Sequence, residues 1–147
     1  MMIDRVERLL LTVWVGCLWA VGLLVAPTLF RVLDDRKLAG TVAGDLFSQV
    51  AIIGLVCGIA LLVIAYTQNY RPQKEWRVWL IVVMIALTVI SRFVLQPMIV
   101  DLRSQGIVPG SDIAKTFGML HGISSALYMA NCVMGAVLVV MGLRRGR

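Results

Sequence analysis

Four long apolar runs, each almost free of charge, constrain the fold of this 147-residue chain more than any other feature. They extend from about Leu9 to Phe30, Leu46 to Tyr66, Val78 to Val100 and Phe117 to Leu143, and Arg92 is the only Lys, Arg, Asp or Glu inside them. A helix of about 20 apolar residues spans the hydrocarbon of a bilayer, and backbone groups in lipid need partners within the segment. Because the runs also lack the alternating pattern of barrel strands, all four are predicted to be membrane-spanning α-helices.

The composition excludes other classes of protein. Hydrophobic residues make up 60% of the chain and charged residues 15%, against about 45–50% and about 25% in soluble domains. The 3 cysteines cannot all pair with one another, which excludes a fully disulfide-bonded framework. The first apolar run is too long, and Asp4 and Glu7 make its start too acidic, for a cleaved signal peptide. We therefore predict an all-α fold: one integral membrane domain over residues 1–147, built as an antiparallel four-helix bundle.

The basic residues predict the orientation in the membrane. Four spans place both termini and the loop after Tyr66 on one face with eight Lys and Arg residues: Arg5, Arg8, Arg71, Lys74, Arg77, Arg144, Arg145 and Arg147. The other face carries five: Arg31, Arg36, Lys37, Arg103 and Lys115. Basic loops stay in the cytoplasm, so a multi-pass protein of the inner membrane with cytoplasmic N- and C-termini is predicted. The basic residues that raise the pI to about 9.8 would lie beside the anionic lipid headgroups of that face. This placement explains the high pI without a nucleic-acid partner, and none is expected.

Two segments outside the apolar runs have patterns of their own. Leu38, Val42 and Leu46 recur at every fourth position, so residues 34–45 are predicted to be helical. This helix either continues into the second span or lies in the membrane interface. Residues 101–115 contain several turn-forming residues and are predicted to be a loop.

Small residues and prolines predict how the spans pack. In lipid, small residues four positions apart let helices approach closely. The chain has three such pairs: Gly16 with Ala20, Gly54 with Gly58, and Gly118 with Gly122. They predict a compact bundle and are equally suited to a homo-oligomer. Pro27 and Pro97 are expected to kink or end the first and third spans near their outer ends, so a cavity is expected in the outer half.

Polar residues within the spans define a candidate site. A charge at mid-membrane costs about 2.5–3.5 kcal/mol on insertion scales, so Arg92 should face the bundle interior or water. Thr88 and Gln96 lie four residues to either side of it and complete a polar stripe. The fourth span carries a second stripe, formed by His121, Ser125, Tyr128 and Cys132. Arg92 and Ser125 lie at the same depth by rise per residue, so we predict that the two stripes face each other.

Arg92 has two interpretations. As a functional group it holds an anion or substrate in a polar pocket between the third and fourth spans. As a structural group it ties the helices together. Asp45, at the mouth of the second span, is the nearest candidate carboxylate if Arg92 reaches outward.

No cofactor or catalytic residue is assigned. His121 is the only histidine, and it is either a hydrogen-bonded interior residue or a titrating or metal-binding one. Cys17, Cys57 and Cys132 lie within spans, where they are either soft metal ligands suited to Cu(I) or small apolar packing residues. No Ser-His-Asp set, Walker loop or pair of intramembrane carboxylates can be assembled, so a non-enzymatic role is favoured.

Several short motifs lie in order along nearly the whole chain: Leu29-Phe30-Arg31, Leu46-Phe47, Arg92 followed by Pro97, and Phe117 with His121-Gly122-Ile123-Ser124-Ser125. Together they resemble the transmembrane protein 205-like family, membrane proteins that share a domain of unknown function. The resemblance implies a small four-helix membrane protein of bacteria, and the drug-resistance association of the family's animal member implies export or trafficking. Ser48 stands where a proline often follows Leu-Phe in that family.

A more distant likeness connects the chain to small four-helix copper-resistance proteins and to the membrane protoporphyrinogen oxidase. Those proteins place a histidine in the first helix, where this chain has Leu9-Leu10-Leu11. Three functions follow from the sequence. The first is an inner-membrane protein that binds or passes a small solute or ion, the second an accessory or assembly subunit of a membrane complex, and the third a haem-pathway or metal-resistance protein.

Overall fold

The computed structural model describes residues 2–68 and 76–141, and every regular element in these ranges is helical. The elements are α1 (Met2–Trp19), the π-helical turn η1 (Ala20–Val25), α2 (Ala26–Val32), α3 (Arg36–Thr67), α4 (Trp76–Ile90), the π-helical turn η2 (Ser91–Leu95), α5 (Gln96–Ser104) and α6 (Asp112–Met141). They join into four continuous helices, each long and apolar enough to cross a membrane. The chain is therefore an all-helical, multi-pass membrane protein.

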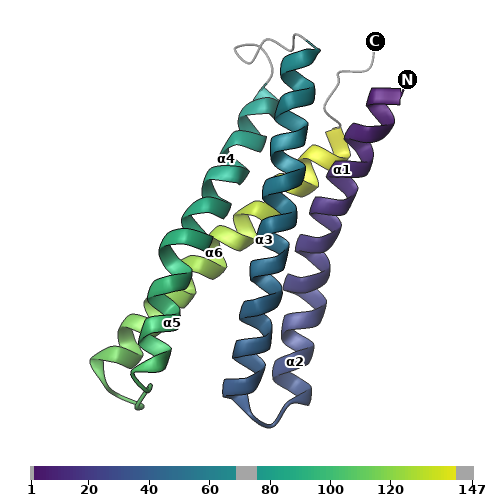
Figure 1. The fold of residues 1–147 in the computed structure, drawn as a ribbon. Coiled ribbons are helices and arrows are strands. Elements are labelled where there is room, and N and C mark those ends of the chain that lie inside the picture. The colour runs from purple at the N-terminus through teal and green to yellow at the C-terminus, as the bar shows by residue number, and fades with distance from the viewer. Residues whose placement is uncertain (1, 69–75, 142–147) are drawn as a thin grey trace.

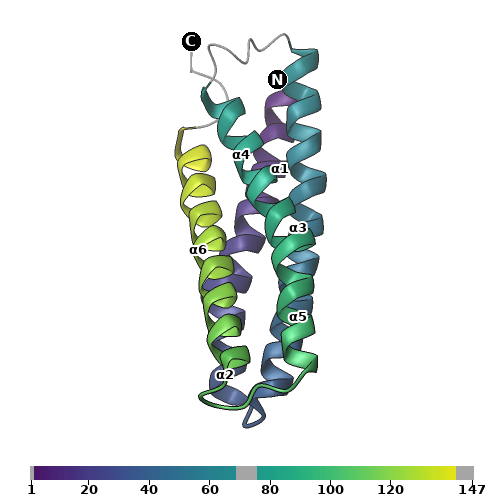
Figure 2. The same ribbon diagram turned by 90° about the vertical axis from the view of Figure 1, so that its left-hand side faces the viewer.

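The chain passes along the long axis of the molecule four times (Figure 1). The beginning of α1 and the end of α6 lie at one end, and the connections 33–35 and 105–111 lie at the opposite end, here termed the loop end (Figures 1 and 2). α1 packs against α3 and α6, and α4 packs against the same two helices. Toward the loop end, α2 stays beside α3 and α5 stays beside α6, while these two pairs separate from each other (Figure 1).

Several helix boundaries differ from the predicted ones. The first helix begins at Met2, seven residues before the apolar run. α3 begins at Arg36 and continues into the second span, which is the first of the two alternatives for residues 34–45. The Asp35 carboxylate caps this helix by accepting hydrogen bonds from the Lys37 and Leu38 amides at 2.8 and 3.1 Å. The predicted loop 101–115 is too long, because α5 continues to Ser104 and α6 starts at Asp112. Most of the loop after Thr67, and the end of the fourth run at Leu143, lie outside the described residues.

Pro27 and Pro97, the prolines within the spans, each follow a π-turn and do not end their helices. The Ala26 amide donates to the Val21 carbonyl and the Gln96 amide donates to the Ser91 carbonyl, five residues back in each case. Pro27 and Pro97 then occupy the second position of α2 and α5. Proline lacks an amide hydrogen and its ring clashes with the carbonyl four residues earlier, and the wider turn accommodates both effects. The first and third spans therefore continue past their prolines to the loop end.

The core fills the half of the bundle away from the loop end. Its most deeply buried side chains are Trp14, Leu61, Ile81, Met84 and Leu138, which come from all four spans. The Trp14 ring lies against Gly54 and Gly58 of α3, where a Cβ would come within 2.5 and 3.1 Å of the ring atoms. A side chain at either glycine would collide with the tryptophan, so this pair provides the close helix contact that its spacing predicts.

The other two small-residue pairs do not form such contacts. A Cβ placed on Gly16, Gly118 or Gly122 would meet no atom within 4 Å. The prediction that these glycines bring helices together inside the bundle is wrong, because they lie on its outer surface. Self-association through them stays a prediction.

Replacing Gly58 by valine should destabilise the bundle by about 1–3 kcal/mol, a typical cost of overpacking a core. The new Cβ would lie 2.8 Å from the Ile85 Cγ1 atom and 3.1 Å from the Trp14 ring. Gly16→Val is the matched control, because that position is open. Thermal unfolding in mild detergent measures the difference, and equal melting temperatures for the two variants would contradict the packing.

Candidate functional site

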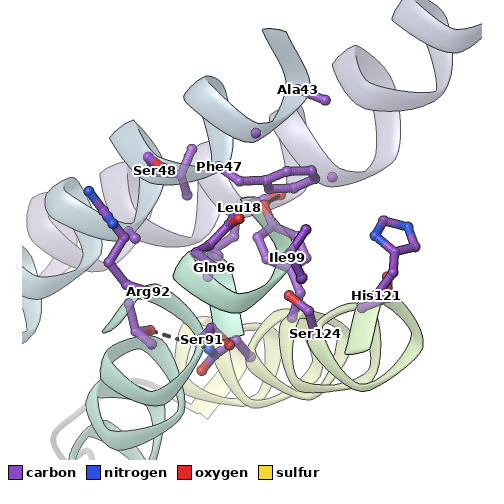
Figure 3. A pocket seen from close by; sticks show the side chains of 18 of the residues that line it. Leu18, Ala43, Phe47, Ser48, Ser91, Arg92, Gln96, Ile99, His121 and Ser124 are labelled. Atoms are coloured by element: carbon purple, nitrogen blue, oxygen red, sulfur yellow. Dashed lines mark hydrogen bonds between the residues drawn. The ribbon is translucent and has the colours of Figure 1, made fainter. Parts of the chain in front are cut away.

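A cavity of about 240 Å³ lies where the helix pairs separate, and all four spans line it. The pocket predicted between the third and fourth spans therefore has two further walls. α3 contributes Gly40, Gly44, Phe47 and Ala51, whose spacing of four, three and four residues places them on one helical face. The α1–η1–α2 span contributes Gly22, Phe30 and Leu18, of which Leu18 is labelled in Figure 3.

The cavity brings together six of the seven predicted pocket residues: Thr88, Arg92, Gln96, His121, Ser125 and Tyr128. Asp45 is not among the lining residues, and its side chain is exposed. It follows the cavity-lining Gly44 by one residue, and a helix turns about 100° per residue, so Asp45 projects away from the cavity. Neither Asp nor Glu lines the cavity among the described residues.

Arg92 lies in the turn η2 and is half-buried. In Figure 3 its side chain extends toward α3, on the side of Ser48, while His121 lies on the opposite side of the pocket. The guanidinium makes no hydrogen bond or ion pair with any described residue, and it lies 5.8 Å from the centroid of the adjacent Phe93 ring. Its hydrogen-bond donors thus remain available to water or a ligand in the cavity.

Thr88 and Asn131 form the end of the cavity nearest the core. The Asn131 Nδ2 atom donates to the Thr88 hydroxyl at 3.3 Å, and this hydroxyl donates to the Met84 carbonyl at 2.8 Å. Asn131 is only 4% exposed, and its Oδ1 atom has no hydrogen-bond partner. Buried acceptors are normally satisfied, so this oxygen requires a donor from water or a ligand.

Asn131 was not predicted as a pocket residue. The second polar stripe was extended from Tyr128 to Cys132, four residues later, whereas the structure continues it to Asn131, three residues later. Both steps are compatible with a helical face, and the rarity of a buried amide in an apolar helix is the signal that favoured Asn131. Cys132 is buried in the core and does not line the cavity.

Tyr128 ties the fourth span to the first. Its hydroxyl donates to the Leu18 carbonyl at 2.6 Å, just before the π-turn η1. Its ring occupies the space beside Gly22, where any Cβ would overlap it, and packs edge-on against Phe47 with 4.8 Å between centroids. Trp19 adds a second tie, because its Nε1 atom donates to the Cys132 carbonyl at 3.2 Å. Tyr128 is thus both a cavity wall and a partner for the backbone at the interrupted helix.

Arg103 is a second cationic residue of the cavity that was assigned to a loop from the sequence. It is half-buried on α5, where its Nη2 atom lies 3.4 Å from the position of a Cβ on Gly40 of α3. The guanidinium also lies 5.9 Å from the centroid of the Phe117 ring on α6. Arg92 and Arg103 both line the cavity, so the third span supplies it with two cationic side chains.

The cysteines and the histidine do not assemble a metal site. Cys57 and Cys132 are buried in the core, Cys17 packs against it, and none of the three lines the cavity. His121 is exposed and stacks on Phe117, with 5.9 Å between ring centroids. In residues 2–68 and 76–141, no group of three or more His, Cys, Asp or Glu side chains is placed to hold a metal ion.

Removing the Tyr128 hydroxyl in Tyr128→Phe should reduce stability by about 0.6 kcal/mol, the average for a side-chain hydrogen bond in a membrane bundle, and by about 1.7 kcal/mol at most. The loss arises because the Leu18 carbonyl loses the donor that lies 2.6 Å away. Tyr66→Phe is the control, since Tyr66 is 84% exposed. Unfolding in detergent at increasing denaturant measures both, and an unchanged midpoint for Tyr128→Phe would show that the bond contributes nothing.

Comparison with known proteins identified one family. The model of a domain of unknown function, DUF4149, matches residues 9–107, which cover most of the first span and all of the second and third. No curated protein and no solved structure matched the chain. The match fits a membrane protein whose activity has to be inferred from its site.

Proposed function

Because the chain belongs to the DUF4149 family, which is defined by a domain of unknown function, we propose that it binds or passes a small solute or ion through the cavity at the loop end. We also propose, from the motifs around Phe30, Phe47, Arg92 and His121, that it is a member of the transmembrane protein 205-like family. The proposed activity is non-enzymatic and requires no resident cofactor.

The observation that carries the proposal is that Arg92 lines the cavity without a hydrogen bond or ion pair to any described residue. A guanidinium that served only to tie helices together would be expected to bond to a carboxylate, hydroxyl or carbonyl of a neighbouring helix. Arg92 has no such bond to any described residue and lines a cavity instead. The unpartnered Oδ1 atom of Asn131, another residue that lines the cavity, supports the same interpretation. A polar cavity with unused donors and an unused acceptor is suited to a small polar ligand.

We propose further that the protein lies in the inner membrane with both termini in the cytoplasm. The support is the excess of Lys and Arg on the face that carries the termini. The loop end and its cavity would then face the outer leaflet, and the basic cytoplasmic face would contact anionic lipids.

The remaining functions have less support. A haem-pathway role would need axial ligands, and His121, the single histidine, is exposed and stacked on Phe117. An accessory role in a complex, or a homo-oligomer, remains a proposal that rests on the outward-facing Gly118 and Gly122.

Filling the cavity should abolish ligand binding. Gly44 lies in the middle of the α3 face that lines the cavity, and a Cβ there would meet no atom within 4 Å, so Gly44→Leu should fold and occupy the space. A ligand that binds the folded state raises the melting temperature, so thermal unfolding against a panel of small anions, cations and neutral solutes reports binding.

At least one solute class should stabilise the wild type and Gly16→Leu but not Gly44→Leu. Gly16→Leu is the matched control, because the same substitution falls on an open outer surface. If no solute in the panel distinguishes the two variants, the proposed function is wrong.

The orientation has its own test. A reporter that matures only in the cytoplasm, such as green fluorescent protein, should fluoresce when fused after Arg147. An alkaline phosphatase inserted between Gly106 and Gly110 should be active, because that loop would lie in the periplasm. The opposite pair of results would reverse the orientation while leaving the cavity in place.

A further inference from the structure

The two halves of the chain form the same helical hairpin twice. Each half begins with a helix that contains a π-turn followed two residues later by a proline, and then continues with one long helix. Pro97 follows Pro27 by 70 residues, and Phe117 follows Phe47 by the same interval. Buried positions repeat at this interval as well: Leu11 and Ile81, Trp14 and Met84, Val50 and Leu120, Leu61 and Asn131, Ala65 and Gly135.

The helix contacts follow the same repeat. α1 packs on α3 as α4 packs on α6, and α2 packs on α3 as α5 packs on α6. Between the halves, α3 packs on α4 as α6 packs on α1. This is the arrangement of a parallel internal repeat, and in transporters built from repeats the substrate site lies at the repeat interface. The cavity occupies that interface, since both halves line it.

The two halves differ in chemistry where they line the cavity. Leu18 and Gly22 of the first half correspond to Thr88 and Arg92 of the second, at the same interval of 70 residues. The first half thus contributes apolar side chains and space, including Phe30, Phe47 and Val50, and the second half contributes most of the polar groups. A ligand in the cavity would therefore meet mainly apolar side chains from the first half and mainly polar and cationic side chains from the second.

We infer that the ligand is a compact organic anion with an apolar body, whose charged group binds Arg92 and whose body rests against the first half. This inference rests on the proposed function and adds the class of ligand. Arg92 has unused donors, and Arg103 places a second guanidinium at the loop end of the same cavity. No carboxylate among the described residues lines the cavity to offset these charges. A cation would be repelled at low dielectric, and a neutral ligand would leave Arg92 without a counter-charge.

The size of the cavity limits the ligand further. Its volume of about 240 Å³ lies just below the roughly 300 Å³ at which pockets for drug-sized ligands begin. A complete two-chain lipid is therefore too large, although the anionic headgroup of one has the required chemistry. A carboxylate or phosphate monoester with a small apolar group fits, whether it comes from water or from a lipid headgroup.

Three probes with one ring and different charges test the inference: benzoate, benzyl alcohol and benzylammonium. Melting temperatures of the purified full-length protein in uncharged detergent would be measured against the concentration of each probe. Benzoate should stabilise the wild type and Gly16→Leu and should not stabilise Gly44→Leu. Arg92→Gln should weaken benzoate binding about tenfold or more, the range for hydrogen bonds to a charged group. Inorganic phosphate, which has no apolar body, should bind more weakly than benzoate.

Two further experiments distinguish a soluble anion from a lipid headgroup and provide a second variant in case the first does not fold. In nanodiscs, unchanged benzoate affinity on replacing phosphatidylcholine by phosphatidylglycerol would identify a soluble anion, and a loss of affinity would identify the lipid headgroup as the ligand. If Arg92→Gln does not fold, Arg103→Gln serves instead, and it should weaken benzoate binding most at low salt, where the charge acts over the longest range.

Two results would overturn the inference. Equal or stronger stabilisation by benzyl alcohol or benzylammonium that disappears in Gly44→Leu would show that the cavity binds solutes without selecting anions. The proposed solute binding would then be supported, and the inference that the ligand is an anion would be wrong. Full benzoate affinity in Arg92→Gln and Arg103→Gln would likewise remove the anion site. A failure of the proposed function is distinct, because there no solute of any charge discriminates Gly44→Leu from Gly16→Leu.

Discussion

In a lipid environment every backbone amide and carbonyl needs a partner inside the protein, and this constraint is most demanding where the first and third spans depart from regular helix. The π-turns η1 and η2 contain the extra residue that lets each helix pass its proline without ending. Around η1, the fourth span supplies the missing support, since Tyr128 bonds to Leu18 and Trp19 bonds to Cys132. The same turns contribute Gly22, Ser91 and Arg92 to the cavity. Local backbone pairing and the candidate site therefore depend on the same few residues.

Much of the fold could be predicted because the strongest features of the sequence are compatible with few structures. A charge-free run of about 20 residues has few alternatives to a membrane helix. The cost of an intramembrane charge required Arg92 to face polar surroundings, and rise per residue placed it at the depth of Ser125. All residues of the two stripes except Cys132 line the cavity. The family match and the four helices agree with a membrane protein of this kind.

The remaining features of the site depend on details that periodicity does not encode. Arg103 was assigned to a loop because the third apolar run ends at Val100 and turn-forming residues follow it. The π-turn that lets α5 continue has no recognisable sequence signal. Asp45 was the nearest candidate carboxylate for Arg92 because it lies at the mouth of the second span, but its position one residue after Gly44 turns it out of the cavity. Spacing alone likewise gave Gly118 and Gly122 the same packing role as Gly54 and Gly58, although only the latter meet a tryptophan. Such facts depend on which neighbour faces each helix.

The repeated hairpin explains how a chain this small holds a charged cavity in an apolar bundle. Each half contains one helix that is interrupted by a π-turn on the way to the loop end, and each π-turn places a residue at the repeat interface. A side chain at position 22 would overlap the Tyr128 ring, and an arginine there would also add a further positive charge at low dielectric. Gly22 in the first half instead leaves room for the Tyr128 ring, so the fourth span can pack closely and hold η1 in place. The half that carries the charge thus supports the interrupted helix of the half that has glycine at the equivalent position, and the asymmetry of the cavity follows from this packing as much as from any ligand.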